Sequence, residues 1–526
     1  MPATLLDVKS AAARLRFVVP EAHEEDYIQL LQNTDAAVAE LFAIPDYIPF
    51  VDTERFPRRE VHRPKDEDNL LRGWAWKANI GGAEEGILAG RTVVVKDTIC
   101  VAGVPLLFGT DAIEDLIPEV DATVITRVLE KGGQIVGKAT CENFSHGAVS
   151  FSSAYGPVEN PHAVGFSTGG SSSGCGALIG SGVVDMGIGG DQGGSIRIPA
   201  SLCGIVGLKP TFGLVPYTGV LSSDATVDTV GPMARSVSDC ALLLEAIAGC
   251  DGIDDRQLGA PLPADVLKYS ELLEAGREKG VKGMKIGVLK EGFGHASMDS
   301  EMEKVCREAL KKFEELGAVV EEVSIPLHAN SGSMCHVLNK FSSSQTRQGR
   351  QAGRRGLHMN SYWAKLLPWD QGKYDKAKYF VTGTSMSAEY GWNTYPTIYG
   401  HAINLSRRLS DEYDAVLAEY DVICMPTVTQ PARRHLSADA GPLAWSKAAR
   451  DSPGIVSNTA ASSLTGHPAL TIPVGFTPPQ KSDVRSAEDA GIKLPVGLML
   501  VGKKFDEATV LKVGDAWERA FDRKKL

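Results

Sequence analysis

Short runs of β-branched residues alternate with amphipathic stretches through most of the chain, and this alternation constrains the fold more than any other feature. The segment 90–97, GRTVVVKD, predicts a buried strand, and 134–140, QIVGKAT, predicts another. Between them, 121–133 has helical apolar spacing and stops at glycine. A helix over 237–249 and a strand over 284–290 continue the pattern. The chain is therefore predicted to be an α/β protein, with a large mixed sheet sandwiched by helices.

Two regions depart from this rhythm. Residues 1–75 combine a predicted helix over 24–44 with a Pro-rich, charged connector, so we expect a separate N-terminal helical region and a main domain over 76–526. The segment of about 330–410 is rich in aromatic residues, and such a segment often lines a pocket or an interface. We therefore predict that it lines a substrate pocket.

Net charge, cysteine spacing and the N-terminal sequence limit the binding partners and the cellular compartment that we expect. A net charge of −11 disfavours nucleic acid and anionic membranes as partners. Nine cysteines without C-x-x-C spacing indicate free thiols in a reducing compartment. The N-terminus has no apolar signal region, so we expect a cytoplasmic protein. The terminal Lys-Lys-Leu only loosely resembles a peroxisomal address.

Two motifs fit well-known patterns but lack the required context. GFSTG at 165–169 spells the nucleophile elbow G-x-S-x-G, yet no apolar strand enters it. GGQIVGKAT at 132–140 nearly matches a P-loop, but Ala139 occupies the hydroxyl position and a strand follows where a helix is needed. No spacing typical of metal ligands is present, and neither a metal nor a cofactor is predicted.

A set of segments carries a resemblance instead. VVVKDTICVAGVP contains Lys96, STGGSSSGCGALIGSG covers 167–182, and GIGGDQGGSIRIPASLCGIVGLKPTFGLVP covers 187–216. This set resembles the amidase signature family of amide hydrolases, and further matching segments extend the likeness over about residues 86–510. The resemblance implies the family's fold and a triad of serine, cis-serine and lysine in place of Ser-His-Asp.

Carried over to this chain, the resemblance makes Ser195 the nucleophile, Ser171 the bridging serine and Lys96 the base. A serine hydroxyl needs a base to attack an amide, and lysine is a base only when it is neutral. The valine-rich strand end could supply the burial that lowers the pKa of Lys96. The family's cis peptide bond would fall at Gly170–Ser171.

The resemblance also assigns the residues around the triad. Ser172 and Arg197 match positions that surround it, and we expect Asp191 to order the loop. Gly169 and Gly170 are assigned to substrate binding. Two glycines in DQGGS permit a turn that offers successive backbone N–H donors to an oxyanion. That predicted oxyanion hole consists of Gln192, Gly193, Gly194 and Ser195.

The chain departs from the family pattern at two positions. After GGSS many relatives continue with glycine, whereas this chain has Ser173 before Gly174, and Met499 stands where glutamine is common. Neither is a triad position. We predict an amidase that hydrolyses a small carboxylic amide to the acid and ammonia. The alternatives are the glutaminase subunit of a tRNA-dependent amidotransferase and a catalytically inactive binding protein. Relatives with such an N-terminal region tend to dimerise through it, so we expect a homodimer.

Overall fold

The computed structural model describes residues 2–350, 353–437, 440–450 and 455–521, so the terminal Lys-Lys-Leu lies outside the described residues. The chain divides into two compact units, Met1–Phe50 and Val51–Leu526. The predicted boundary was later, after residue 75. The division falls earlier because residues 59–62 already form a strand of the main sheet.

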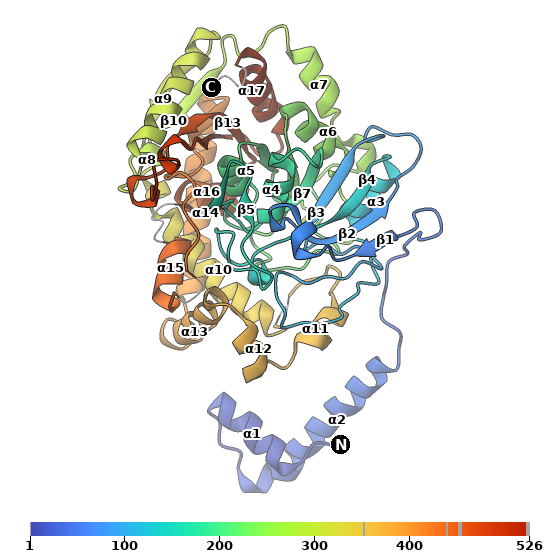
Figure 1. The fold of residues 1–526 in the computed structure, drawn as a ribbon. Coiled ribbons are helices and arrows are strands. Elements are labelled where there is room, and N and C mark those ends of the chain that lie inside the picture. The colour runs from blue at the N-terminus through green and yellow to red at the C-terminus, as the bar shows by residue number, and fades with distance from the viewer. Residues whose placement is uncertain (1, 351–352, 438–439, 451–454, 522–526) are drawn as a thin grey trace. The chain divides into compact units, whose positions relative to one another are not determined.

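The first unit is a pair of helices, drawn in blue in Figure 1: α1 (Leu5–Leu15) and α2 (Glu24–Phe42). The second helix confirms the helix predicted over 24–44. Phe17 packs edge-on against Tyr27, with ring centroids 6.0 Å apart. The Lys9 ammonium lies 3.3 Å from the Glu24 carboxylate. These contacts hold α1 and α2 together as a hairpin.

The described strands of the second unit are short, mostly of four to nine residues. They are β1 (Arg59–His62), β2 (Trp74–Ile80), β3 (Thr92–Lys96), β4 (Gln134–Ala139), β5 (Glu159–Asn160), β6 (Ala163–Ser167), β7 (Met186–Asp191), β8 (Val206–Lys209), β9 (Thr229–Ala234), β10 (Lys285–Leu289), β11 (Val319–Val323), β12 (Val422–Pro426), β13 (Ala469–Thr477) and β14 (Leu494–Val501). The strands predicted over 90–97, 134–140 and 284–290 are β3, β4 and β10.

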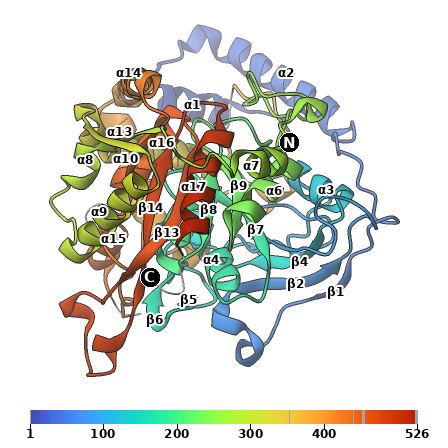
Figure 2. The same ribbon diagram turned by 90° about the horizontal axis from the view of Figure 1, so that it is seen from above.

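Twelve strands of the described chain form one mixed sheet in the order β1-β2-β4-β3-β7-β9-β8-β13-β14-β12-β10-β11, which Figure 2 shows from β1 across to β14. β3 pairs in parallel with both β4 and β7. β7 pairs antiparallel with β9, and β13 antiparallel with β14. The fold class predicted from the sequence, a large mixed sheet with helices packed on it, is confirmed.

The helices of the second unit are α3 (Thr123–Glu130), α4 (Ser173–Gly180), α5 (Arg197–Cys203), α6 (Val237–Ile247), α7 (Tyr269–Gly276), α8 (Lys290–Phe293), α9 (Ser300–Glu315), α10 (Ser331–Arg347), α11 (Asn360–Leu366), α12 (Gln371–Lys376), α13 (Tyr379–Thr394), α14 (Ile398–Glu419), α15 (Pro442–Arg450), α16 (Ser457–Thr465) and α17 (Glu507–Ala520). Helices α10 to α14 contain most of the aromatic-rich segment. None of the helices in the described ranges combines the length and apolarity of a membrane span.

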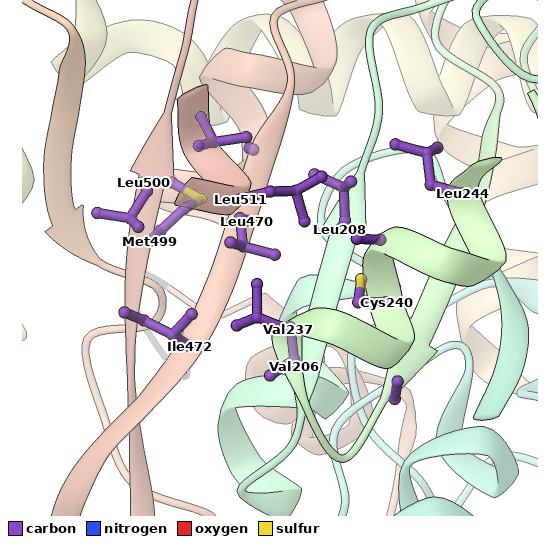
Figure 3. Packing of buried hydrophobic residues seen from close by; sticks show 14 of the residues in the cluster. Val206, Leu208, Val237, Cys240, Leu244, Leu470, Ile472, Met499, Leu500 and Leu511 are labelled. Carbon is purple, nitrogen blue, oxygen red and sulfur yellow. The ribbon is translucent and has the colours of Figure 1, made fainter. Parts of the chain in front are cut away.

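The main core extends over both halves of the sheet, and one part of it lies where helices α6 and α17 pack on the strands (Figure 3). Its labelled members come from the strands β8, β13 and β14 and from these two helices: Val206, Leu208, Val237, Cys240, Leu244, Leu470, Ile472, Met499, Leu500 and Leu511. Alternate residues of β13 face this layer, because side chains of a strand point to opposite faces in turn. The core fixes the sheet on which the site is built.

The sheet brings two strand ends together. β3 ends at Lys96 and β7 ends at Asp191, and the two strands are parallel neighbours. The carboxyl ends of parallel neighbours meet at one edge of a sheet, which is where ligand sites of α/β proteins commonly form. The loop after β7 leads directly into α5, and the Gly/Ser-rich segment 167–172 leads into α4.

Candidate active site

Lys96 lies at the end of β3 and is fully buried. Its Nζ donates to the Ser171 hydroxyl at 2.8 Å and to the Gly190 carbonyl at 3.1 Å. Burial lowers the pKa of Lys96 below its ordinary value, and the negative charge of the nearby Asp191 only partly opposes that shift. Burial thus shifts this lysine toward the neutral form that a base requires.

Ser171 follows the cis peptide bond Gly170–Ser171, so the predicted position of that bond is confirmed. A Cβ on residue 170 would come within 2.1 Å of the Val149 carbonyl oxygen, which requires glycine there. Residue 169 has φ of +69° and is also crowded by the Ile198 side chain. Both glycines are therefore needed to shape the segment that presents Ser171.

Ser171 has a second hydroxyl neighbour that the sequence did not single out. The Oγ of Ser145 lies 3.0 Å from the Oγ of Ser171. Ser145 belongs to CENFSHG, a segment that shares the family resemblance, but nothing in its spacing marked it as part of the site. Ser171 thus lies between the Lys96 amine and the Ser145 hydroxyl.

Ser195 lies on the loop between β7 and α5 and is half-buried. Its carbonyl accepts a hydrogen bond of 3.3 Å from the Ser172 amide, which joins this loop to the segment that carries Ser171. Within the described residues, no hydrogen bond joins the Ser195 hydroxyl to Ser171. Catalytic hydrogen bonds are often long until a substrate is bound, so this geometry is compatible with a nucleophile.

The Asp191 side chain holds this loop in place through hydrogen bonds to its backbone. Its carboxylate accepts the Gly194 amide at 2.7 Å and the Ile196 amide at 3.1 Å. Burial alone would raise the pKa of Asp191, but the charge and hydrogen bonds of Arg197 outweigh it and lower that pKa. Asp191 therefore stays a carboxylate and acts as an acceptor for the loop.

Arg197 is fully buried, and its Nε and Nη2 donate to the two Asp191 oxygens at 2.9 and 2.8 Å. It also donates three hydrogen bonds to α16, to the Thr459 carbonyl at 2.8 Å, the Ser462 hydroxyl at 2.5 Å and the Ser463 hydroxyl at 2.8 Å. The pair therefore clamps the loop to a helix more than 250 positions further along the chain. The sequence did not single out these α16 residues, and only the hydroxyl-rich run SNTAASSLT hinted at them.

The four predicted oxyanion donors differ in their surroundings. The Gly194 N–H is used by Asp191. The amides of Gly193 and Ser195 form no hydrogen bond within the described residues, which leaves them free to donate. Thr459 fixes the loop by donating to the Gly193 carbonyl at 2.6 Å, and the Gln192 side chain donates to the Tyr217 hydroxyl at 3.1 Å.

Ser172 connects the two layers of the site. Its hydroxyl donates to the Gly190 carbonyl and accepts from the Gly190 amide, each at 3.2 Å. The Gly190 carbonyl also accepts from Lys96. Ser172 thus lies next to Lys96, where it holds the end of β7.

Helix α10 and the aromatic segment lie beside the loop. A Cβ on Gly193 would contact the Cys335 sulfur at 3.2 Å and the Asn339 amide nitrogen at 3.7 Å, both on α10. Trp369 packs on Phe144, with centroids 5.5 Å apart, and Phe144 precedes Ser145 in the chain. Helix α10 thus adjoins Gly193, and the aromatic segment contacts the residue that precedes Ser145.

The geometry defines a class of site: a buried lysine linked to a serine, beside a second serine on a loop with free backbone donors. Such an arrangement suits nucleophilic attack on a carbonyl carbon. The family model for amidases matches residues 66–511, and the chain belongs to this amidase signature family of hydrolases that act on amides.

Individual relatives refine the comparison. An enantioselective amidase of Rhodococcus rhodochrous is 36% identical over 475 residues, covering 88% of this chain and 86% of that one. A glutamyl-tRNA(Gln) amidotransferase subunit of Moorella thermoacetica is 34% identical over 84% of this chain and 85% of its own length. The peptide amidase of Stenotrophomonas maltophilia superposes with a TM-score of 0.66 at 27% identity, over 83% of this chain and 84% of that one.

Proposed function

We propose that this protein is an amidase that hydrolyses a carboxylic amide to the acid and ammonia through an acyl-enzyme on Ser195. The observation that supports this most directly is the 2.8 Å hydrogen bond between Ser171 and a fully buried Lys96 whose pKa is lowered. A neutral lysine joined to a relay serine is the base that a serine nucleophile needs.

In the acylation step, the Ser195 oxygen attacks the amide carbon while its proton passes to Ser171, and the Ser171 proton passes to Lys96. The carbonyl oxygen becomes an oxyanion, which the free amides of Gly193 and Ser195 stabilise. The proton then returns through Ser171 to the amide nitrogen, the carbon–nitrogen bond breaks, and ammonia leaves. A water molecule attacks the acyl-enzyme by the same relay and releases the acid and free Ser195.

The test combines turnover with trapping of the intermediate. Ammonia release from aliphatic, aromatic and amino-acid amides is measured for the wild type and for Ser195→Ala, Ser171→Ala and Lys96→Met. All three variants should lose activity, and mass spectrometry of rapidly quenched wild type should show Ser195 carrying the acyl group. Undiminished turnover by Ser195→Ala would refute the mechanism.

The second candidate is the glutaminase subunit of a tRNA-dependent amidotransferase, because several relatives of 32–35% identity carry that name. The N-terminal helical unit and the aromatic segment favour the free amidase. Ammonia release from glutamine that requires both tRNA and a partner protein, together with no turnover of simple amides, would support the second candidate instead.

We further propose a cytoplasmic homodimer that assembles through residues 1–50. All nine cysteines are free, as in a reducing compartment. The helical unit exposes many large apolar side chains, including Leu41, Phe42 and Phe50. Exposed apolar patches of this kind mark association surfaces. Light scattering on the full chain and on Leu41→Glu tests this, since the variant should become monomeric.

A further inference from the structure

Arg347, the last residue of α10, is a buried cation that no step of the mechanism uses. Its side chain is only 5% exposed. Within the described chain, its Nε and Nη2 are buried and have no hydrogen-bond partner. Buried guanidinium groups are normally paired, because an unpaired buried charge is costly. Arg347 is an exception.

In the part of the chain that the structure describes, the surroundings of Arg347 supply no counter-charge. The titratable groups that act on it within the described residues are the phenols of Tyr362 and Tyr374, not a carboxylate. Burial lowers the pKa of Arg347 to about 10, so the group is still a cation at neutral pH. The Tyr362 hydroxyl is also buried and has no hydrogen-bond partner among the described residues. Two kinds of unsatisfied donor thus occur together.

Arg347 is linked to two parts of the candidate site, the segment of Ser145 and the loop between β7 and α5. Its carbonyl accepts the Trp369 indole N–H at 2.8 Å, and the Trp369 ring packs on Phe144, which adjoins Ser145. Its own helix places Asn339 against Gly193 of the loop. Eight residues of helix separate Asn339 from Arg347, which is about 12 Å along the axis.

Long side chains on a helix point toward the helix N-terminus, which is the direction in which Asn339 lies from Arg347 on α10. A group held by Arg347 would therefore lie roughly 6–8 Å further along α10 than Asn339. A chain of about five to seven bonds spans that distance.

We propose that Arg347 and Tyr362 bind a carboxylate on the substrate, so that the amides hydrolysed at Ser195 carry an acidic group at the far end of the acyl chain. The inference rests on the proposed amidase function. A carboxylate fits because it can accept two parallel N–H bonds from one guanidinium and a further bond from a phenol. Trp369 and Phe144 would flank an apolar or aromatic spacer.

The test compares matched acidic and neutral amides. Adipamate and 4-carbamoylbenzoate are the acidic substrates, and heptanamide and 4-acetylbenzamide are their neutral counterparts. We measure kcat/KM for the wild type, Arg347→Met, Arg347→Lys and Tyr362→Phe. Arg350→Met is the matched control, because Arg350 is an exposed arginine three residues away.

The wild type should prefer the acidic member of each pair. Arg347→Met should lower kcat/KM for the acidic amides about 30-fold or more and leave the neutral amides within about 3-fold. Arg347→Lys should fall between the two, since it keeps the charge without the planar fork. Arg350→Met should match the wild type. An equal ratio of acidic to neutral turnover in the wild type and Arg347→Met would overturn the inference.

A binding experiment without hydrolysis tests the carboxylate site independently of the proposed amidase activity. Calorimetry measures adipate binding to the wild type and to Arg347→Met, with no hydrolysis involved. Adipate that binds the wild type alone would support the carboxylate site even if no amide were turned over, whereas failure of turnover with every amide would refute only the amidase. If Arg347→Met proved unfolded, the comparison of Arg347→Lys and Tyr362→Phe with the wild type would decide. Equal adipate binding by all folded variants would contradict the proposal.

Discussion

Replacing Asp191 by Asn should destabilise the protein and disorder the catalytic loop. The substitution keeps the shape of the side chain but removes its charge and turns one acceptor into a donor. The Arg197 guanidinium, fully buried and bonded to both Asp191 oxygens, would then lack its counter-charge. Removing one partner of a buried ion pair costs about 3–5 kcal/mol.

The size of the effect on Tm follows from the size of the domain. The second unit has roughly 480 residues, and unfolding entropy of about 2.1 cal/mol/K per residue gives about 1 kcal/mol/K. A loss of about 3–5 kcal/mol should therefore lower Tm by about 3–5 °C. Scanning calorimetry at pH 7 measures this, and kcat/KM for an amide should fall as well, because Asp191 holds the Gly194 and Ile196 amides.

Two comparisons make the result specific. Glu412→Gln breaks the exposed Arg408–Glu412 pair of 3.0 Å and should lower Tm by less than about 1 °C. The double variant Asp191→Asn/Arg197→Met should lose less than the sum of the two single variants, because each single substitution strands the other partner. An Asp191→Asn variant with unchanged Tm, or strictly additive losses, would refute the assignment of Asp191 and Arg197 as one buried unit.

Three further outcomes are expected. Because Lys96 must be neutral to act, kcat/KM should rise with pH through the lowered pKa of Lys96, at a pH below its ordinary value of 10.5, and Lys96→Met should abolish this limb together with most activity. Ser145→Ala should lower kcat about 10-fold with little change in KM, because it loosens Ser171 rather than substrate, and a pH profile should keep its midpoint. Burial raises the pKa of Glu142 from 4.5 to about 8, so the folded protein holds a proton that the unfolded chain releases, and stability falls as pH rises from about 4.5 to 8. The Tm of Glu142→Gln should therefore exceed that of the wild type at pH 8 but not at pH 4.5, which thermal unfolding at the two pH values measures.

The parts of the fold that could be predicted from the sequence are those with strong local signals. The valine run before Lys96 predicted β3, and the apolar spacing of 121–133 predicted α3. Strands such as β1 and β8 have four residues each and lack a clear alternation, so local pattern could not identify them. The order of the sheet depends on contacts between distant segments, which no local pattern encodes.

The site shows the same division. A resemblance carried over residue by residue could predict the position of the cis bond at Gly170–Ser171, because that bond lies within one contiguous motif. It could not predict that Arg197 is held by Thr459 and Ser463, since the partners come from a distant helix. Nor could it show that Arg347 is buried with no counter-charge among the described residues, because burial of an arginine depends on the packing of the whole aromatic segment.

The groups around Lys96 support the proposal that this lysine acts as the base in place of a histidine. Two cysteines and one glutamate adjoin the base, and each is a group that would raise the pKa of Lys96 if it were ionised. Burial raises the pKa of the Cys141 and Cys175 thiols and of Glu142, so these neighbours are held neutral at pH 7. The remaining ionised carboxylate, Asp191, is paired with Arg197, which offsets its charge. The same burial that lowers the pKa of Lys96 thus also keeps neutral the neighbouring groups that would oppose this shift.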